Sequence, residues 1–188
     1  SSPSRGLGDV YKRQYQKELG SLVELFGHLQ SSAGEAAVQF SGSLSSAQFG
    51  QERVSFLNEL TSKMSETTEL PTIREIEGLW YELQRELVAS GQVVSFNTDV
   101  TEIGGQSTSC DVTRIGLFNA VCDGKYLKYV ASTGGYAFLP RQPAGRYTST
   151  AKKVGNADIG DQIKFGIDPT GPTGGSLLAN LILSLIHI

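Results

Sequence analysis

Apolar residues recur every three or four positions through the first third of the chain, a pattern that predicts amphipathic helices. The spacing places helices over about 15–30, 35–48 and 50–64, separated by serine-rich joints. The first of these has a leucine-rich stripe of the kind that packs against another helix. The sequence therefore predicts a helical, coiled-coil-like arm over residues 15–70.

The most strongly marked helix is expected over 72–90. Thr72 and Glu75 have the spacing of a capping box at its start, and Gly91 favours its end. Its apolar face includes Trp80, which is predicted to be a core anchor rather than a ligand platform. Acidic residues on this helix alternate with arginines, which is typical of a solvated face with ion pairs. These acidic residues are Glu75, Glu77, Glu82 and Glu86.

Beyond residue 93 the apolar period changes to two, which predicts strands. The expected strands are 94–100, 108–122, 126–130 and 136–139. Asp123-Gly124 lies between two apolar runs and predicts a tight hairpin, whereas Gly116 is a candidate bulge. An antiparallel sheet of this kind needs one covered face. We therefore expect a four-strand antiparallel meander covered by the amphipathic 72–90 helix.

The rest of the chain carries weaker signals of secondary structure. A short helix is expected near 146–156, and Gly175-Ser176-Leu177-Leu178 favours the start of another helix. The predicted class is α+β, with an α+β domain over 71–168. Residues 169–182 are expected to be a linker and the start of a helix toward a membrane.

Both ends of the sequence resemble translated library-preparation DNA. Asp9–Gln14 back-translates to GAT GTG TAT AAG AGA CAG, and Leu183–Ile188 to its reverse complement, CTG TCT CTT ATA CAC ATC. Both strings match the transposase end sequence used for shotgun libraries. We therefore expect residues 1–14 and 183–188 to be non-native sequencing adapter, and the remainder to be a metagenomic fragment.

The charge limits the expected partners. The chain has a formal net charge of −3, and removing three basic residues and one acidic residue with 1–14 makes it −5. An acidic chain without a basic run argues against nucleic acid and against an anionic membrane surface. No apolar run approaches the ~20 residues of a membrane span, so a membrane is expected only through a missing downstream segment.

Residues suited to catalysis are few. His28 is the one histidine between the expected adapter ends, and no nucleophile, base and orienting group can be assembled around it. We expect no catalytic residue, metal site or cofactor. Cys110 and Cys122 would lie about 40 Å apart on one extended strand. Both are expected to be unpaired, because a disulfide would require a sharp chain reversal between them.

The partner surface is predicted from exposed aromatic and basic residues, which are favoured at interfaces. We expect it on the sheet face left open by the 72–90 helix, at Tyr126, Lys128, Tyr136 and Arg141. Half-burial in the sheet is the simpler explanation of each tyrosine alone. Binding of an anion or a glycan by the same region is a less favoured alternative.

Several stretches, taken in order, resemble one known family. They are Leu70–Ile73, Leu79–Glu86, Arg114–Val121, Asp123–Leu127, Arg141–Arg146 and Gly166–Thr170. The set resembles the N-terminal extension of some MotA/TolQ/ExbB-type proton-channel proteins of TonB-type systems in Gram-negative bacteria. The resemblance covers most of 15–182, although the arginine typical of the family at Gly171 or Pro172 is missing.

The resemblance implies a long coiled coil followed by a periplasmic α+β domain of an inner-membrane protein. It implies a non-catalytic interaction or scaffold domain of an ExbB-like subunit, oligomeric at full length and serving outer-membrane transport. Its partners would be other subunits of a TonB-type complex, not nucleic acid or a small-molecule substrate. The family's proton-conducting residues lie downstream, and none is assigned here. The alternatives are a stand-alone periplasmic coiled-coil adaptor and, less favoured, a glycan- or anion-binding module.

Overall fold

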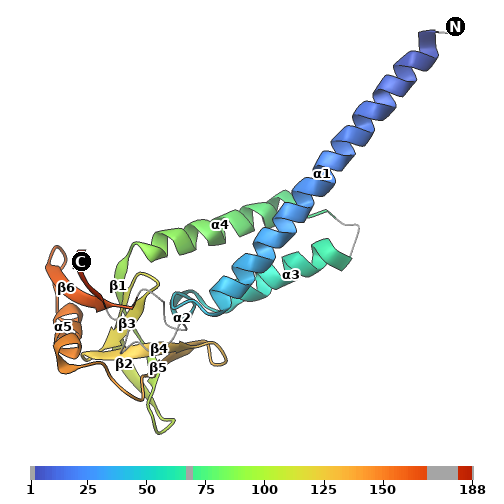
Figure 1. Ribbon diagram of the computed structural model, residues 1–188. Helices are drawn as coiled ribbons and strands as arrows, with labels where there is room; N and C mark the ends of the chain where they lie inside the picture. Colours follow the sequence, from blue (N-terminus) through green and yellow to red (C-terminus); the bar gives the residue numbers. More distant parts are fainter. Residues whose placement is uncertain (1–2, 67–69, 169–181, 188) are drawn as a thin grey trace.

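The computed structural model describes residues 3–66, 70–168 and 182–187. A helical arm leads into a small β-barrel, and the start of the first helix projects away from both (Figure 1). The helices of the arm are α1 (Pro3–Ser41), α2 (Ser46–Phe49), α3 (Glu52–Glu66) and α4 (Ile73–Ser90). No helix in the described part of the chain is long and apolar enough to cross a membrane.

Helix α1 replaces the two helices expected over 15–30 and 35–48, so the predicted joint between them was wrong. Ser31 lies within the continuous helix, and its hydroxyl donates to the Glu35 carboxylate one turn later, at 3.1 Å. The helix also includes residues 3–14, for which an adapter origin stays a prediction. The predictions of helices over 50–64 and 72–90 are confirmed, and the Thr72–Glu75 capping box is present.

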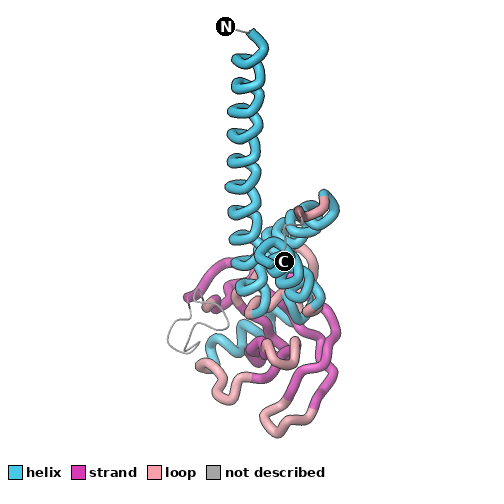
Figure 2. The backbone as a smooth tube through the Cα atoms, turned by 90° about the vertical axis from the view of Figure 1, so that its right-hand side faces the viewer, coloured by secondary structure: helices cyan, strands magenta, loops and turns pink. Residues whose placement is uncertain are grey.

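Helix α3 returns alongside the second half of α1 (Figure 1). Small side chains on α1 allow this close approach, and a buried cluster fills the space between the helices and α4. The cluster consists of Ala33, Ala36, Ala37, Phe40, Leu57, Leu60 and Leu79. By contrast, the first half of α1 stands clear of the rest of the chain (Figure 2).

Five strands form a closed barrel: β1 (Val93–Thr101), β2 (Ser107–Ile115), β3 (Asn119–Cys122), β4 (Lys125–Val130) and β5 (Gly135–Phe138). Consecutive strands pair antiparallel, and β5 closes the barrel by pairing parallel with β1 through Val100↔Tyr136 and Thr101↔Ala137. The predicted four-strand antiparallel meander is therefore wrong.

Gly116 explains the extra strand. The expected strand over 108–122 reverses after β2, where Gly116 has φ +54°. A Cβ at this position would lie 2.6 Å from the carbonyl oxygen of Ser90, so the close approach of two backbone segments requires glycine. The residue makes a turn between two paired strands, not a bulge within one. The tight hairpin at Asp123-Gly124 is confirmed, with φ of +48° and +75°.

Two buried clusters complete the barrel. One lies toward α2 and includes Leu44, Val112 and Tyr136. The other lies toward α5 (Gly145–Gly155), which confirms the short helix predicted there, and β6 (Gln162–Ile167). Strand β7 (Ile182–His187) pairs antiparallel with β6. The predicted linker over 169–182 lies almost wholly outside the described residues, as does the helix start at Gly175.

Helix α4 does not cover the sheet, and this central prediction was wrong. Trp80 is 63 % exposed, whereas Leu79 on the neighbouring face is buried against α1 and α3. The helix meets the barrel at its C-terminal end, where Arg114 binds the carbonyl of Ala89. The closed barrel buries its own interior, and its outer apolar face is covered by α5 and β6, so neither face requires α4 as a cover.

Candidate interaction surface

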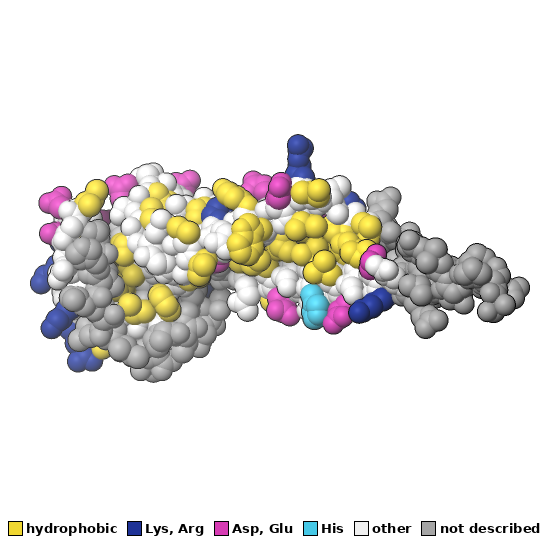
Figure 3. All heavy atoms as spheres, turned by 90° about the horizontal axis from the view of Figure 1, so that it is seen from above, with side chains coloured by type: hydrophobic (Ala, Val, Ile, Leu, Met, Phe, Trp, Pro, Cys, Tyr) yellow, Lys and Arg dark blue, Asp and Glu magenta, His cyan; other side chains and the backbone are white. Residues whose placement is uncertain are grey.

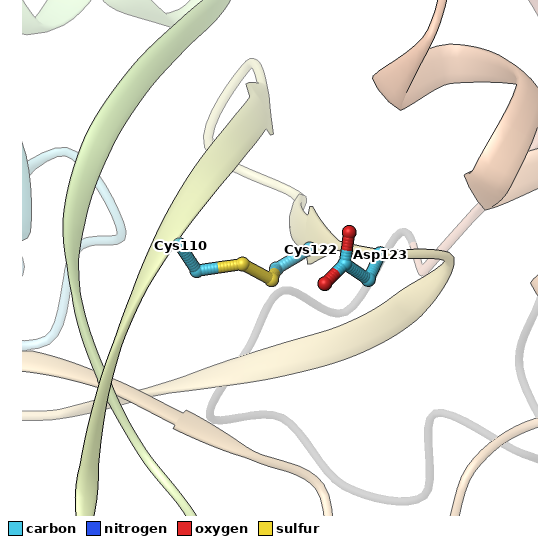
Figure 4. A group of neighbouring side chains, drawn as sticks. All are labelled: Cys110, Cys122 and Asp123. Atoms are coloured by element: carbon cyan, nitrogen blue, oxygen red, sulfur yellow. A yellow bond between two sulfur atoms is a disulfide. The ribbon is translucent and has the colours of Figure 1, made fainter.

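Cys110 of β2 and Cys122 of β3 form a disulfide, with their Cα atoms 6.3 Å apart (Figure 4). The prediction that both are unpaired was wrong because the chain reverses between them at 116–118. Asp123 lies beside the disulfide, and the three side chains approach within 4.8 Å of one another. This group is unsuited to a metal ion, because cysteine binds metal as a thiolate and both sulfurs are bonded to each other.

The two tyrosines of the predicted partner surface are buried and belong to different clusters. Tyr126 stacks on Phe165 at 5.4 Å and donates to the carbonyl of Gly166 at 3.0 Å. Tyr136 donates to the carbonyl of Leu44 at 2.7 Å, and thus joins the barrel to the segment after α1. Burial raises the pKa of both phenols, which keeps them protonated as donors.

Lys128 and Arg141 are exposed, on β4 and after β5 respectively. The structure therefore does not bring the four predicted site residues together on one surface. Since the barrel is closed, the open sheet face that was expected to present them does not exist. A role of Lys128 or Arg141 in binding a partner stays a prediction.

The base of the arm contains a buried polar cluster. Arg53 of α3 is 3 % exposed and donates to the carboxylate of Glu86 on α4 at 2.7 Å. It also donates to the hydroxyls of Ser45 and Ser46, and its guanidinium lies over the Phe40 ring at 4.4 Å. These contacts fix α3, α4 and the segment between α1 and α2 relative to one another.

The predicted solvated acidic face holds for Glu75, whose carboxylate binds Lys63 at 3.0 Å near the surface. It fails for Glu82 and Glu86, which lie toward the interior. Burial raises the pKa of Glu82, and the neighbouring Arg85 at 2.9 Å opposes this shift. The exposed His28, by contrast, is a surface residue of α1 as expected.

Arg114 of β2 joins the barrel to the arm. Its side chain is fully buried and donates to the carbonyls of Ala89 at 2.8 Å and Gly116 at 2.6 Å. It also binds the side-chain oxygen of Gln48 in α2. The Ala89 carbonyl, which also accepts from the Gln92 backbone N–H, lies at the end of α4. Arm and barrel are thus connected through hydrogen bonds as well as through the chain.

The first half of α1 carries apolar side chains that no described helix covers. Leu22 and Leu25 are 46 % and 58 % exposed, and Phe26 is half-buried. At the helical period they lie on the side of α1 that contacts α3 further along, from Ala33 to Phe40. The packing side of α1 therefore continues beyond the part that α3 covers.

Helix α4 carries a second exposed apolar row. We call the two rows together the apolar strip. It comprises Leu22, Leu25 and Phe26 of α1, and Ile73, Ile76, Trp80 and Leu87 of α4. Figure 3 shows hydrophobic side chains gathered along the helical part, with acidic and basic side chains on both sides. Such a contiguous apolar surface with a charged border is typical of a protein interface.

A separate hollow of about 340 Å³ opens at the barrel beside the disulfide. Its wall includes Glu102, Asp123 and Lys125 as well as the apolar Phe138. The acidic and basic residues of this wall are exposed to solvent. The apolar strip is therefore the stronger candidate site.

Sequence reasoning missed both the strip and the contacts that hold it in place. The spacing of Ile73, Ile76 and Trp80 identified an apolar face but did not indicate that it lies open. Arg53 and Arg114 carry no local signal in the sequence, because their partners are distant along the chain. One signal could have indicated the strip: amphipathic helices precede a domain whose strands can enclose their own core, so the apolar faces of those helices need another partner.

No family model matches this chain, and the comparisons with curated proteins and with solved structures likewise found no match.

Proposed function

We propose that this chain is a periplasmic interaction and spacer domain of an ExbB-like subunit in a TonB-type energy-transducing system, without catalytic chemistry of its own. The single observation that carries the interaction role is the apolar strip, presented on a helical arm. The assignment to this class of subunit rests on the ordered motifs from Leu70–Ile73 to Gly166–Thr170, which run from the start of α4 past the barrel.

The length of the helical arm suits the role of a spacer. At ~1.5 Å per residue, the part of α1 from Tyr15 to Ser41 is about 40 Å long. The contacts of Arg53 and Arg114 fix its base to the barrel. A partner bound on the arm is thereby held at a defined position relative to the barrel, which is what a scaffold between membrane components requires.

The Cys110–Cys122 disulfide supports the proposed compartment. Structural disulfides persist in oxidising compartments such as the periplasm and are rare in the reducing cytosol. This argument is independent of the family resemblance. It favours the periplasmic side for both the subunit hypothesis and the stand-alone adaptor.

The proposal is tested first by extending the reading frame beyond residue 182 through an overlapping genomic sequence. We expect membrane helices within about 150 codons, since a channel subunit needs spans of ~20 apolar residues. A stop codon soon after residue 182 would instead identify the stand-alone adaptor. A long downstream frame without membrane helices would refute the assignment.

The interaction role is tested by crosslinking in cells that express the extended protein. A photo-reactive amino acid at Trp80, which is 63 % exposed in the strip, should give protein adducts. Ile159 is 99 % exposed in the loop before β6 and serves as the control position. Equal adduct formation at both positions would argue against the strip as an interface.

A further inference from the structure

We propose that the outer side of α5 and β6 is a basic surface that binds the anionic phospholipid headgroups of the membrane and so directs the helical arm away from the bilayer. We call this surface the basic face. It comprises Arg146, Lys152 and Lys153 of α5 and Lys164 of β6, all of which are exposed. The inference rests on the proposed function, because it places the domain beside the membrane that would hold the rest of the subunit.

The charge of the chain is unevenly distributed along it. Residues 15–124, which form the arm and the first three strands of the barrel, contain six basic and fifteen acidic residues. Residues 125–168, which form the last two barrel strands, α5 and β6, contain seven basic and three acidic residues. The net charge is therefore −9 for the first part and +4 for the second. The charge of the whole chain disfavours an anionic surface, whereas the charge of the second part favours one.

The fold places the basic residues of α5 and β6 on the side that faces solvent. The other side of the two elements is apolar and packs on the barrel through Tyr147, Ala151, Val154 and Phe165. Neither α5 nor β6 contains an acidic residue. Figure 3 shows Lys and Arg side chains grouped at this end of the molecule, with acidic side chains beside the group. Basic residues that are dispersed in the sequence thus share one end of the folded chain.

The basic face is not neutralised by ion pairs within the chain. Every ion pair in the described part of the structure lies in the arm. Arg146 lies over the ring of Tyr147 and donates to its hydroxyl at 3.0 Å, a contact that supplies no counter-charge. In the loop between α5 and β6, the carboxylate of Asp161 accepts from the backbone N–H of Asp158 at 3.1 Å. The cations of the basic face are therefore available to an external anion.

The position of the basic face fits a bilayer. In the proposed subunit the chain leaves β6 at Asp168 and is expected to enter a helix toward the membrane at Gly175. The six residues between them span at most about 25 Å when extended, which keeps the barrel near the bilayer. Anionic headgroups attract basic side chains within about 10 Å of the membrane surface.

The same placement gives the arm a direction. Elements α5 and β6 lie at the end of the molecule opposite to the start of α1 (Figure 1). When the basic face lies against the headgroups, the acidic arm therefore points away from them. Attraction at one end and repulsion at the other favour the same orientation, and this orientation is the one that a spacer standing on the membrane requires.

Vesicle binding by the full chain tests the basic face. We would measure co-sedimentation with vesicles that contain equal parts of phosphatidylglycerol and phosphatidylcholine, and with vesicles of phosphatidylcholine alone. The expected result is binding to the anionic vesicles and none to the neutral ones. Added salt should weaken this binding, because the Debye length falls from about 10 Å at 0.1 M to about 3 Å at 1 M.

Matched double variants identify the surface. Lys152→Gln/Lys153→Gln should weaken binding to the anionic vesicles by about twentyfold or more, since each basic residue near the surface contributes about fivefold. Lys17→Gln/Arg74→Gln removes two exposed charges of the arm, gives the same net charge and should leave binding unchanged. Lys152→Arg/Lys153→Arg keeps the charge of the basic face and should bind as the parent does. Far-ultraviolet circular dichroism checks that all three variants stay folded.

Equal binding to both kinds of vesicle, or no binding to either at low salt, would overturn the lipid proposal. So would an equal loss of binding in the two glutamine variants. Protein adducts from a photo-reactive amino acid at Lys153 in cells, without vesicle binding by the purified chain, would assign the basic face to an acidic protein instead of lipid. None of these results affects the proposed function, whose first test is the downstream reading frame. Conversely, salt-dependent vesicle binding by a chain whose extended frame encodes no membrane helices would keep the basic face and remove the ExbB-like assignment.

Discussion

Nη1 of Arg53 lies 2.7 Å from Oε2 of Glu86, although 33 positions separate the two residues. The pair joins α3 to α4, and its side chains are 1 % and 13 % exposed. Because both charged groups are largely buried, each requires the opposite charge of the other to offset its loss of hydration. The pair therefore specifies how the two helices sit together at the base of the arm.

Removing one partner should cost more than removing both. Arg53→Met leaves the Glu86 carboxylate without its counter-charge and should lower the free energy of unfolding by about 3–5 kcal/mol. The double variant Arg53→Met/Glu86→Leu should recover most of this loss. Urea unfolding of the three proteins measures both effects. A single variant as stable as the parent would show that the pair is not a structural constraint.

Arg114→Lys should loosen the connection between the barrel and α4. One ammonium cannot replace the planar guanidinium that binds Ala89, Gly116 and Gln48 together. We expect a loss of about 2–3 kcal/mol, with faster amide hydrogen exchange in the last turn of α4. Unchanged exchange there, with intact barrel protection, would contradict the connecting role.

Reduction of the disulfide should destabilise the barrel. The two cysteines are 12 residues apart, and closing a loop of this length is worth about 3 kcal/mol by the chain-entropy relation. We expect a lower melting temperature in reductant. The variant Cys110→Ala/Cys122→Ala should melt near the reduced protein and should not respond to reductant. If the parent protein melts at the same temperature with and without reductant, the disulfide does not contribute to the stability of the barrel.

The start of α4 should lose stability in acid. Hydrogen bonding to the Thr72 backbone, and then to Lys63, lowers the pKa of Glu75 from 4.5 to about 2. A depressed pKa means that the contribution is present above pH 4.5 and is lost as the pH falls toward 2. Glu75→Gln should flatten this part of the stability profile in urea unfolding. If the free energy of unfolding depends on pH in the same way in both proteins, Glu75 is not a source of the acid sensitivity.

Local signals in the sequence predicted local structure well. The Thr72–Glu75 capping box and the Asp123-Gly124 hairpin both depend on residues within a few positions of each other, and both are present. The spacing of apolar residues likewise identified α3 and α4.

Relations between distant segments could not be predicted in this way. Gly116 indicated an irregularity, but its reversal depends on the closeness of Ser90, and the pairing of Cys110 with Cys122 depends on that reversal. The apolar face of α4 indicated that something must cover it, and the wrong partner was inferred because barrel closure through β1 and β5 has no local signal. The apolar strip was missed for the same reason, because the sequence gives no sign that this face of α4 is left exposed.

The tie between Tyr136 and Leu44 has a mechanical consequence for the distal end of α1. This contact follows about 40 Å of continuous α-helix, measured from Tyr15. By this length, turning the barrel by about 10° would swing the far end through about 7 Å. Because the contacts of Arg53 and Arg114 also hold the base of the arm, the Tyr136 hydroxyl is one of several points through which a small rotation of the barrel would be passed on to the far end of α1 as a larger displacement.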